Sequence, residues 1–162
     1  MWEHVERAEV AATPERVWAI VSDFEGHPRL AGSREVLAVR MAGPLAPGTT
    51  FEGDNLAGEV GSFVSRNRIE VVDPPCELAW MSYPPLDDDE TEEHQIEVRW
   101  WFRLAPAGAG TAVEHGFLVR EPRAGADRLA AFLERTGRLD TVRAGMRQTL
   151  ANLARLAEAQ PG

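Results

Sequence analysis

The sequence predicts an α+β fold in which a curved, seven-stranded antiparallel sheet wraps around one long C-terminal helix. Three observations support this prediction. Strand-like segments fill the middle of the chain, helical periodicity fills its end, and two short helical segments lie between the first and second strands. At 162 residues the chain is long enough for one sizeable core, so we expect a single domain over residues 1–162.

The first strand is expected over about residues 3–12, and a helix is expected to follow it directly. Thr13 offers a hydroxyl that can cap the helix N-terminus, and Pro14 suits the first helical position. Asp23 is expected to cap a second short helix that ends near residues 30–32.

Six further strands are expected, separated by glycine and proline residues that favour turns. Their expected ranges are 34–41, 49–56, 60–73, 77–83, 94–105 and 111–120. Consecutive strands joined by short turns predict an antiparallel meander.

From Ala126 onward, apolar residues recur at helical spacing, which predicts one long helix or two helices joined near Gly137. The apolar face of this segment must be buried, and the concave side of the sheet is the partner available to it. A helix against a strongly curved sheet leaves unfilled volume, so we expect a cavity there. The alternative is a solid core filled by Trp80, Trp100 and Phe102.

Strand alternation converts the sequence into a predicted lining for this cavity, because successive side chains point to opposite faces of a sheet. Arg99 and Arg103 are expected on the outer face with Glu97, and both Ile69 and Val71 are expected on the inner face. The residues predicted to contact a ligand are Phe51, Asn55, Phe63, Ser65, Asn67, Trp80, Ser82, His94, Val98, Trp100, Phe102, Phe117, Met146 and Leu150.

His115 falls on the inner face and is the candidate for catalysis. An imidazole ordinarily titrates near neutrality, so it could act as a general acid or base on a bound molecule. The alternative is a structural histidine whose nitrogens bond to an asparagine or serine of the core. The other inward polar groups are neutral amides, hydroxyls and a second imidazole, which suits a lipophilic molecule carrying a few oxygens.

A metal site is considered and not favoured. His4 and Glu6 would lie near His115 if the first strand pairs with the seventh, but no further ligand motif supports such a site. The acidic run over residues 87–93 lacks the glycine and ligand spacing of a calcium loop, so we expect a mobile, solvated hairpin loop. We predict neither a metal nor a cofactor.

The formal net charge of -9 disfavours binding to nucleic acid or to an anionic membrane surface. No apolar run is long enough to span a bilayer, so no membrane insertion is expected, and the first residues do not resemble a signal peptide. With a single cysteine, Cys76, these features predict a cytoplasmic protein that is a monomer or a homodimer.

The segment from Val10 to Phe24 resembles the opening of the START-like superfamily (SRPBCC), in its polyketide cyclase/dehydrase branch. The stretches 48–55, 78–80 and 145–153 are also similar to segments of that superfamily. Its members include aromatase/cyclases, lipid and sterol carriers, quinone-binding proteins and chaperone activators. The resemblance therefore implies a helix-grip fold that binds a hydrophobic small molecule.

Three functions follow from this resemblance. The favoured one is a carrier or sensor of a polyketide- or lipid-like molecule; the alternatives are an aromatase/cyclase or dehydratase using His115, and a chaperone-activator-like interaction module. Cyclases of this fold typically place a cationic or phenolic side chain inside the cavity. Here Tyr83 and most strand arginines are expected to point outward, and only Arg40, on a strand of ambiguous alternation, is left as an interior cation. This pattern favours binding over turnover and leaves enzymatic activity undecided.

Overall fold

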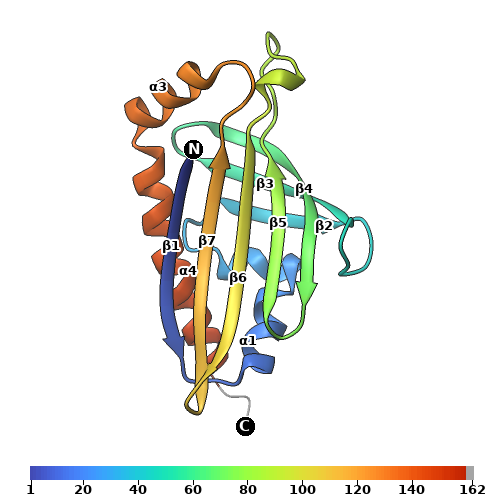
Figure 1. Cartoon of the computed structure of the whole chain (residues 1–162), viewed down its shortest axis with the longest axis vertical. Helices are drawn as coiled ribbons and strands as arrows, with labels where there is room; N and C mark the ends of the chain where they lie inside the picture. The colour runs from blue at the N-terminus through green and yellow to red at the C-terminus, as the bar shows by residue number, and fades with distance from the viewer. Residues whose placement is uncertain (160–162) are drawn as a thin grey trace.

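The computed structural model describes residues 1–159, which form a seven-stranded antiparallel sheet and four α-helices (Figure 1). The strands are β1 (Trp2–Val10), β2 (Val36–Met41), β3 (Thr50–Ala57), β4 (Gly61–Asp73), β5 (Glu77–Tyr83), β6 (Glu97–Ala107) and β7 (Gly110–Arg120). The helices are α1 (Pro14–Val21), α2 (His27–Leu30), α3 (Ala126–Thr136) and α4 (Arg138–Glu158), with 3-10 turns at Phe24–Gly26 and Glu92–His94.

The strand order is β1-β7-β6-β5-β4-β3-β2, so β2 to β7 form a meander and β1 pairs with β7 at one edge. The predicted α+β architecture, with its curved sheet against the C-terminal helix, is confirmed. Over the described residues, no helix has the length and apolar character needed to cross a membrane.

The start of α1 forms as the sequence predicts. The Thr13 hydroxyl accepts a hydrogen bond from the Arg16 amide at 3.2 Å, and Pro14 occupies the first turn. Val17 and Val21 are fully buried beneath the helix, which packs against α4. Asp23, in contrast, makes no side-chain cap, and the helical turn that follows it is short.

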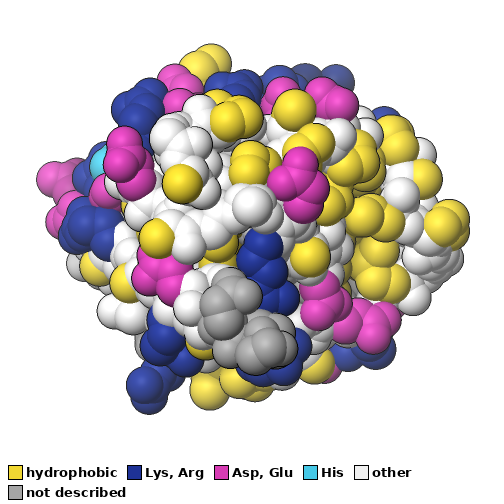
Figure 2. All heavy atoms as spheres, turned by 90° about the horizontal axis from the view of Figure 1, so that it is seen from below, with side chains coloured by type: hydrophobic (Ala, Val, Ile, Leu, Met, Phe, Trp, Pro, Cys, Tyr) yellow, Lys and Arg dark blue, Asp and Glu magenta, His cyan; other side chains and the backbone are white. Residues whose placement is uncertain are grey.

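The C-terminal segment is two helices, as one of the two alternatives predicts. Gly137 separates them with a φ of 63°, a left-handed conformation that glycine adopts without a Cβ clash. The helix α4 runs along the concave side of the sheet next to β1, and α3 crosses its upper end (Figure 1). The lower end, seen in Figure 2, presents interspersed charged and apolar side chains.

Two irregularities change which side chains face the core. The pairing of β4 with β5 shifts between Ile69 and Val71, so Val72, and not Val71, packs against the core. The prediction for Val71 is wrong because a β-bulge interrupts strict alternation. A similar shift near residues 36–38 of β2 turns Val36 and Val39 toward the cavity and leaves Arg40 exposed.

The outer face of the sheet carries a buried tryptophan that strand alternation alone does not explain. Trp101 is 4% exposed, beneath the guanidinium groups of Arg99 and Arg103, whose central carbons lie 5.7 and 5.3 Å from its ring centroid. Its indole N–H donates to Glu114 Oε1 at 3.1 Å. The predicted outward direction of the two arginines is confirmed, since they form ion pairs with Glu70, Glu77 and Glu114 there.

Gly116 lies directly under the Trp101 indole, and a Cβ atom at this position would overlap the ring. We expect Gly116→Ala to lower the free energy of unfolding by about 1 to 3 kcal/mol, because the indole must move out of a packed site. Urea unfolding followed by circular dichroism measures this change. Gly58→Ala is the matched control, since a Cβ there meets no atom within 4 Å. Equal stability of the two variants would contradict the prediction.

Candidate ligand-binding cavity

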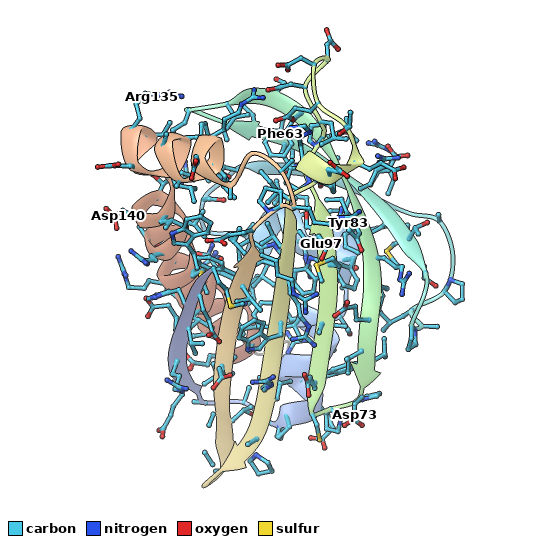
Figure 3. The ribbon with its side chains drawn as sticks, turned by 45° about the horizontal axis from the view of Figure 1, so that its top comes forward. Phe63, Asp73, Tyr83, Glu97, Arg135 and Asp140 are labelled. Atoms are coloured by element: carbon cyan, nitrogen blue, oxygen red, sulfur yellow. The ribbon has the colours of Figure 1, made fainter. Side chains whose placement is uncertain are left out.

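A cavity of about 770 Å³ lies between the concave face of the sheet and the helices α3 and α4. Figure 3 tilts the upper end of the molecule forward and labels Phe63 on β4 and Arg135 on α3. Both residues line the cavity, one from the sheet and one from a helix. The predicted cavity is therefore present. Its volume lies within the range of small-molecule sites, which is roughly 300 to 1,000 Å³.

Most residues predicted to contact a ligand line this cavity. They are Phe51, Asn55, Phe63, Ser65, Asn67, Trp80, Ser82, His94, Val98, Trp100, Phe102, Phe117 and Met146, and His115 is among them. Leu150 is not a lining residue. It is 4% exposed in the core cluster with Leu153 and Val17, because the second half of α4 packs directly on α1 and leaves no space.

The apolar face of α4 therefore has two parts: one lines the cavity, and the other is packed in the core. Leu139, Val142 and Met146 face the cavity, whereas Leu150 and Leu153 fill the core below it. This division explains why a cavity persists although large aromatic side chains are available. Trp80 and Phe102 belong to the packed core, and they present only part of their surface to the cavity above.

Aromatic rings form a continuous wall around His115. The imidazole stacks on Phe102 with ring centroids 4.1 Å apart and an interplanar angle of 6°, and Trp100 lies 5.8 Å away on a nearly parallel plane. Trp80 extends this wall, and its ring centroid lies 6.2 Å from that of Phe102. A flat ligand placed here would meet ring faces and edges, which favour offset or edge-on aromatic contacts.

His115 is buried, and its protonation is set by this apolar site. Its Nδ1 lies 2.9 Å from the carbonyl oxygen of Trp101, which can only accept, so Nδ1 carries the proton and Nε2 holds a lone pair. Burial lowers the pKa of His115 to about 4, and the bond to the carbonyl only partly opposes this. The expectation that this imidazole titrates near neutrality is wrong, because desolvation dominates.

A second buried histidine, His27 of α2, also lines the cavity and is not among the predicted site residues. Its Nε2 lies 2.8 Å from the Val21 carbonyl oxygen, so Nε2 donates and Nδ1 holds the lone pair. Burial lowers the pKa of His27 as well. Strand alternation could not find it, because it sits on a four-residue helix whose orientation depends on packing against Phe24 and Trp80.

Amide and hydroxyl groups on β3 and β4 form one network at the side of the cavity. Asn67 Nδ2 donates to the carbonyl oxygens of Phe51 and Ser65 and to Ser65 Oγ, at 3.3, 3.3 and 3.1 Å. Asn55 Nδ2 donates to the Gly53 carbonyl at 2.9 Å and to Ser65 Oγ at 3.2 Å. The predicted inward polar groups therefore satisfy one another in part, through their N–H groups.

The upper rim of the cavity is built by the acidic segment and α3. The Ala124 amide donates to the Glu93 carbonyl at 2.8 Å, and Arg128 lies 3.6 Å from Asp89 and 3.9 Å from Glu90. The expected solvated hairpin loop is thus tied to the start of α3. His94 lies in the short helical turn before β6, not in the strand, and lines the rim.

A second charged cluster closes the rim where α3 meets α4. Arg138 binds both carboxylate oxygens of Glu35 and lies 3.5 Å from Glu59, which also accepts from the Thr141 hydroxyl at 3.1 Å. The side chains of Arg138, Glu35 and Glu59 are only 17%, 14% and 21% exposed. Hydrogen bonding to Glu35 raises the pKa of Arg138, so this ion pair stays charged.

The predicted neighbourhood of His4, Glu6 and His115 is partly present. Glu6 of β1 is directly opposite His115 of β7 in the sheet, as the predicted pairing requires. However, Glu6 accepts from His4 Nε2 at 2.8 Å and from Arg147 at 3.1 Å, while His115 bonds to Trp101. Over the part of the chain that the structure describes, no cluster of metal-ligating side chains is found.

Among the described residues, no arginine of the strands lines the cavity. Arg40, the ambiguous case, is exposed and forms a two-point pair with Asp54, with distances of 2.5 and 3.0 Å. Arg66 and Arg68 are exposed on the outer face. The cations that do line the cavity are Arg128, Arg135 and Arg138, and all three come from the helices at its rim.

The fold is shared with several solved structures. The di-domain aromatase/cyclase StfQ from the steffimycin biosynthetic pathway aligns with a TM-score of 0.69 and 12% identity, over 96% of this chain and 50% of its own. TTHA0849 from Thermus thermophilus aligns with a TM-score of 0.66 and 18% identity, over 99% of this chain and 100% of its own. The KanY protein (ms6282) aligns with a TM-score of 0.66 and 18% identity, over 98% of each chain. No curated protein matches the sequence.

These neighbours place the chain among helix-grip proteins, in which a curved sheet and a long helix enclose a cavity. The chain belongs to the family described as polyketide cyclase / dehydrase and lipid transport, which it matches over residues 1–158. The predicted resemblance to the polyketide cyclase/dehydrase branch is confirmed.

Proposed function

We propose that this protein binds a lipophilic small molecule in the cavity and acts as a carrier or sensor rather than as an enzyme. The observation that carries this proposal is the cavity of about 770 Å³ walled by aromatic and aliphatic side chains, whose charged lining residues, among those the structure describes, belong to the segments that form its rim. Membership of a family that includes lipid transport supports the same class of ligand.

The cavity supports proton transfer by His115 less well. With a pKa of about 4, the imidazole is neutral at pH 7, with only about 0.1% protonated. It therefore holds no proton to donate from Nε2 and is a weak base. A cyclase or dehydratase would need a ligand that raises this pKa on binding, because the contacts of the ring over residues 1–159 are with the Trp101 carbonyl, Trp100 and Phe102, none of which is acidic.

A fluorescent dye and a variant with a larger side chain in the cavity wall test the proposal. N-phenyl-1-naphthylamine, a neutral dye that fluoresces in apolar sites, should bind the wild-type protein saturably at one site. Val142→Trp should reduce this affinity at least tenfold, because Val142 lines the cavity wall on α4 and an indole would occupy the ligand volume. Fluorescence titration gives both dissociation constants.

The matched control is Ala144→Trp, which adds the same side chain to the exposed face of α4. This variant should bind the dye as the wild type does, and both variants should retain the wild-type far-ultraviolet circular dichroism. Absence of saturable dye binding to the folded wild-type protein would overturn the proposal. Equal binding by both tryptophan variants would place the dye outside the cavity and overturn it as well.

A further inference from the structure

The polar side chains of the cavity have their hydrogen-bond donors directed at the backbone. His115 Nδ1 and His27 Nε2 each face a carbonyl oxygen, and so do the amide nitrogens of Asn55 and Asn67. A carbonyl oxygen can only accept, so these four contacts fix both histidine tautomers and both amide orientations. All four side chains line the cavity.

The opposite atom of each of these side chains is consequently an acceptor. They are His115 Nε2, His27 Nδ1, Asn55 Oδ1 and Asn67 Oδ1, and none has a hydrogen-bond partner among the described residues. The enclosed side-chain polar atoms that lack a partner in this part of the chain are Arg16 Nε and Arg143 Nε. The four acceptors are therefore not sealed within the protein, and the space that their residues line is the cavity.

Donors line the same region as well. Ser65 Oγ accepts from both asparagine amides and keeps one O–H to offer, and Ser82 adds a second hydroxyl. The indole N–H groups of Trp80 and Trp100 are two further donors in the lining. The arginines of the rim lie on α3 and at the start of α4, and Arg128 and Arg138 are engaged with carboxylates. The two imidazole nitrogens and two amide oxygens are nevertheless acceptors only, so a ligand must supply O–H or N–H groups to satisfy them.

We infer that the ligand of this cavity is a neutral molecule with two or more hydroxyl groups, whose O–H groups donate to the interior acceptors. This inference rests on the proposed function and specifies its ligand class. Each such bond satisfies an acceptor that is otherwise desolvated when the ligand displaces water, which is worth roughly threefold to tenfold in affinity. The aromatic wall of Trp80, Trp100 and Phe102 favours a flat carbon skeleton between the hydroxyls.

A carboxylate is disfavoured by the same arrangement. Its oxygens are acceptors only, so inside the cavity they would face the lone pairs of the imidazoles and amides, while the lining cations, Arg128, Arg135 and Arg138, come from the helices at the rim. A fully methylated ether is disfavoured for a different reason, since it carries no proton to donate. These two classes are therefore the informative comparisons.

Three naphthalene probes of similar size separate these cases at pH 7. Displacement of N-phenyl-1-naphthylamine by naphthalene-2,7-diol, 2,7-dimethoxynaphthalene and 2-naphthoate gives three dissociation constants for the wild-type protein. We expect the diol to bind at least tenfold more tightly than the dimethoxy compound, and 2-naphthoate to bind most weakly. A dimethoxy compound or a naphthoate that binds as tightly as the diol would overturn the inference while leaving the proposed function intact.

Two variants assign the preference to named atoms. His115→Phe keeps the ring stacked on Phe102 but removes the Nε2 acceptor, and Asn67→Leu removes Oδ1. Each should reduce the preference for the diol over the dimethoxy compound at least threefold. His4→Phe makes the same exchange outside the cavity lining and should keep the preference. An unchanged preference in both folded cavity variants would also overturn the inference, and if either fails to fold, the wild-type comparison decides.

Discussion

Between pH 7 and pH 4.5, the wild-type protein should lose about 2 to 3 kcal/mol more of its free energy of unfolding than His115→Gln loses. Burial lowers the pKa of His115 from 6.5 in the unfolded chain to about 4 in the fold. Because the unfolded chain takes up the proton first, this contribution is fully present above about pH 6.5 and is lost as the pH falls toward 4. Glutamine can keep a donor for the Trp101 carbonyl but does not titrate.

Urea unfolding of both proteins across this pH range measures the effect. Phe102→Leu is the matched control, because it disturbs the ring stacked on His115 without removing a titrating group, so its pH dependence should match that of the wild type. His27→Gln should flatten the curve in the same direction as His115→Gln, since burial also lowers the pKa of His27. Parallel curves for wild type and His115→Gln would show that the imidazole is not buried in its neutral form.

Arg138→Met should lower the free energy of unfolding by about 3 kcal/mol. The substitution keeps the aliphatic stem but leaves Glu35 and Glu59 without their shared cation, in a site where both carboxylates are largely shielded from water. Urea unfolding at pH 7 and low salt measures the loss. Arg29→Met is the control, because its pair with Asp23 is long, at 3.9 Å, and exposed, and it should change stability by less than about 0.5 kcal/mol.

A second substitution separates lost charge pairing from lost packing. Adding Glu35→Gln to Arg138→Met removes one of the stranded charges and should recover part of the stability. Because the cluster joins Glu35, directly before β2, and the β3–β4 turn to the start of α4, dye release should also be faster in Arg138→Met. If the double variant is no more stable than Arg138→Met, the uncompensated carboxylates are not the cause of the loss.

The strand pattern predicted the lining wherever two strands pair without interruption. Along β6 and β7 the pairing is continuous, so Trp100, Phe102 and Phe117 fall on the predicted inner face. At the β4 bulge the same rule misplaces Val71, since one extra residue reverses every later side chain. No local pattern in the sequence marks that position.

Strand alternation could not predict which residues the helices contribute to the cavity. His27 reaches the interior because its short helix packs beneath Trp80, and Arg138 meets Glu35 across 103 positions of sequence. Both depend on tertiary packing, which no period of two or 3.6 residues encodes. The pKa of His115 was missed for a related reason, because the depth of burial that lowers it depends on the closure of the whole fold.

The division of α4 has a consequence for how this chain can vary. Its second half anchors the fold, where truncating a residue such as Leu153 would cost about 2 to 5 kcal/mol. Its first half lines the cavity, where Leu139 and Val142 are only partly buried at the edge of a core cluster, so exchanging either residue reshapes the cavity and removes fewer packed contacts. Substitutions can therefore accumulate at one end of a single helix and change the preferred ligand, while the other end keeps the protein folded.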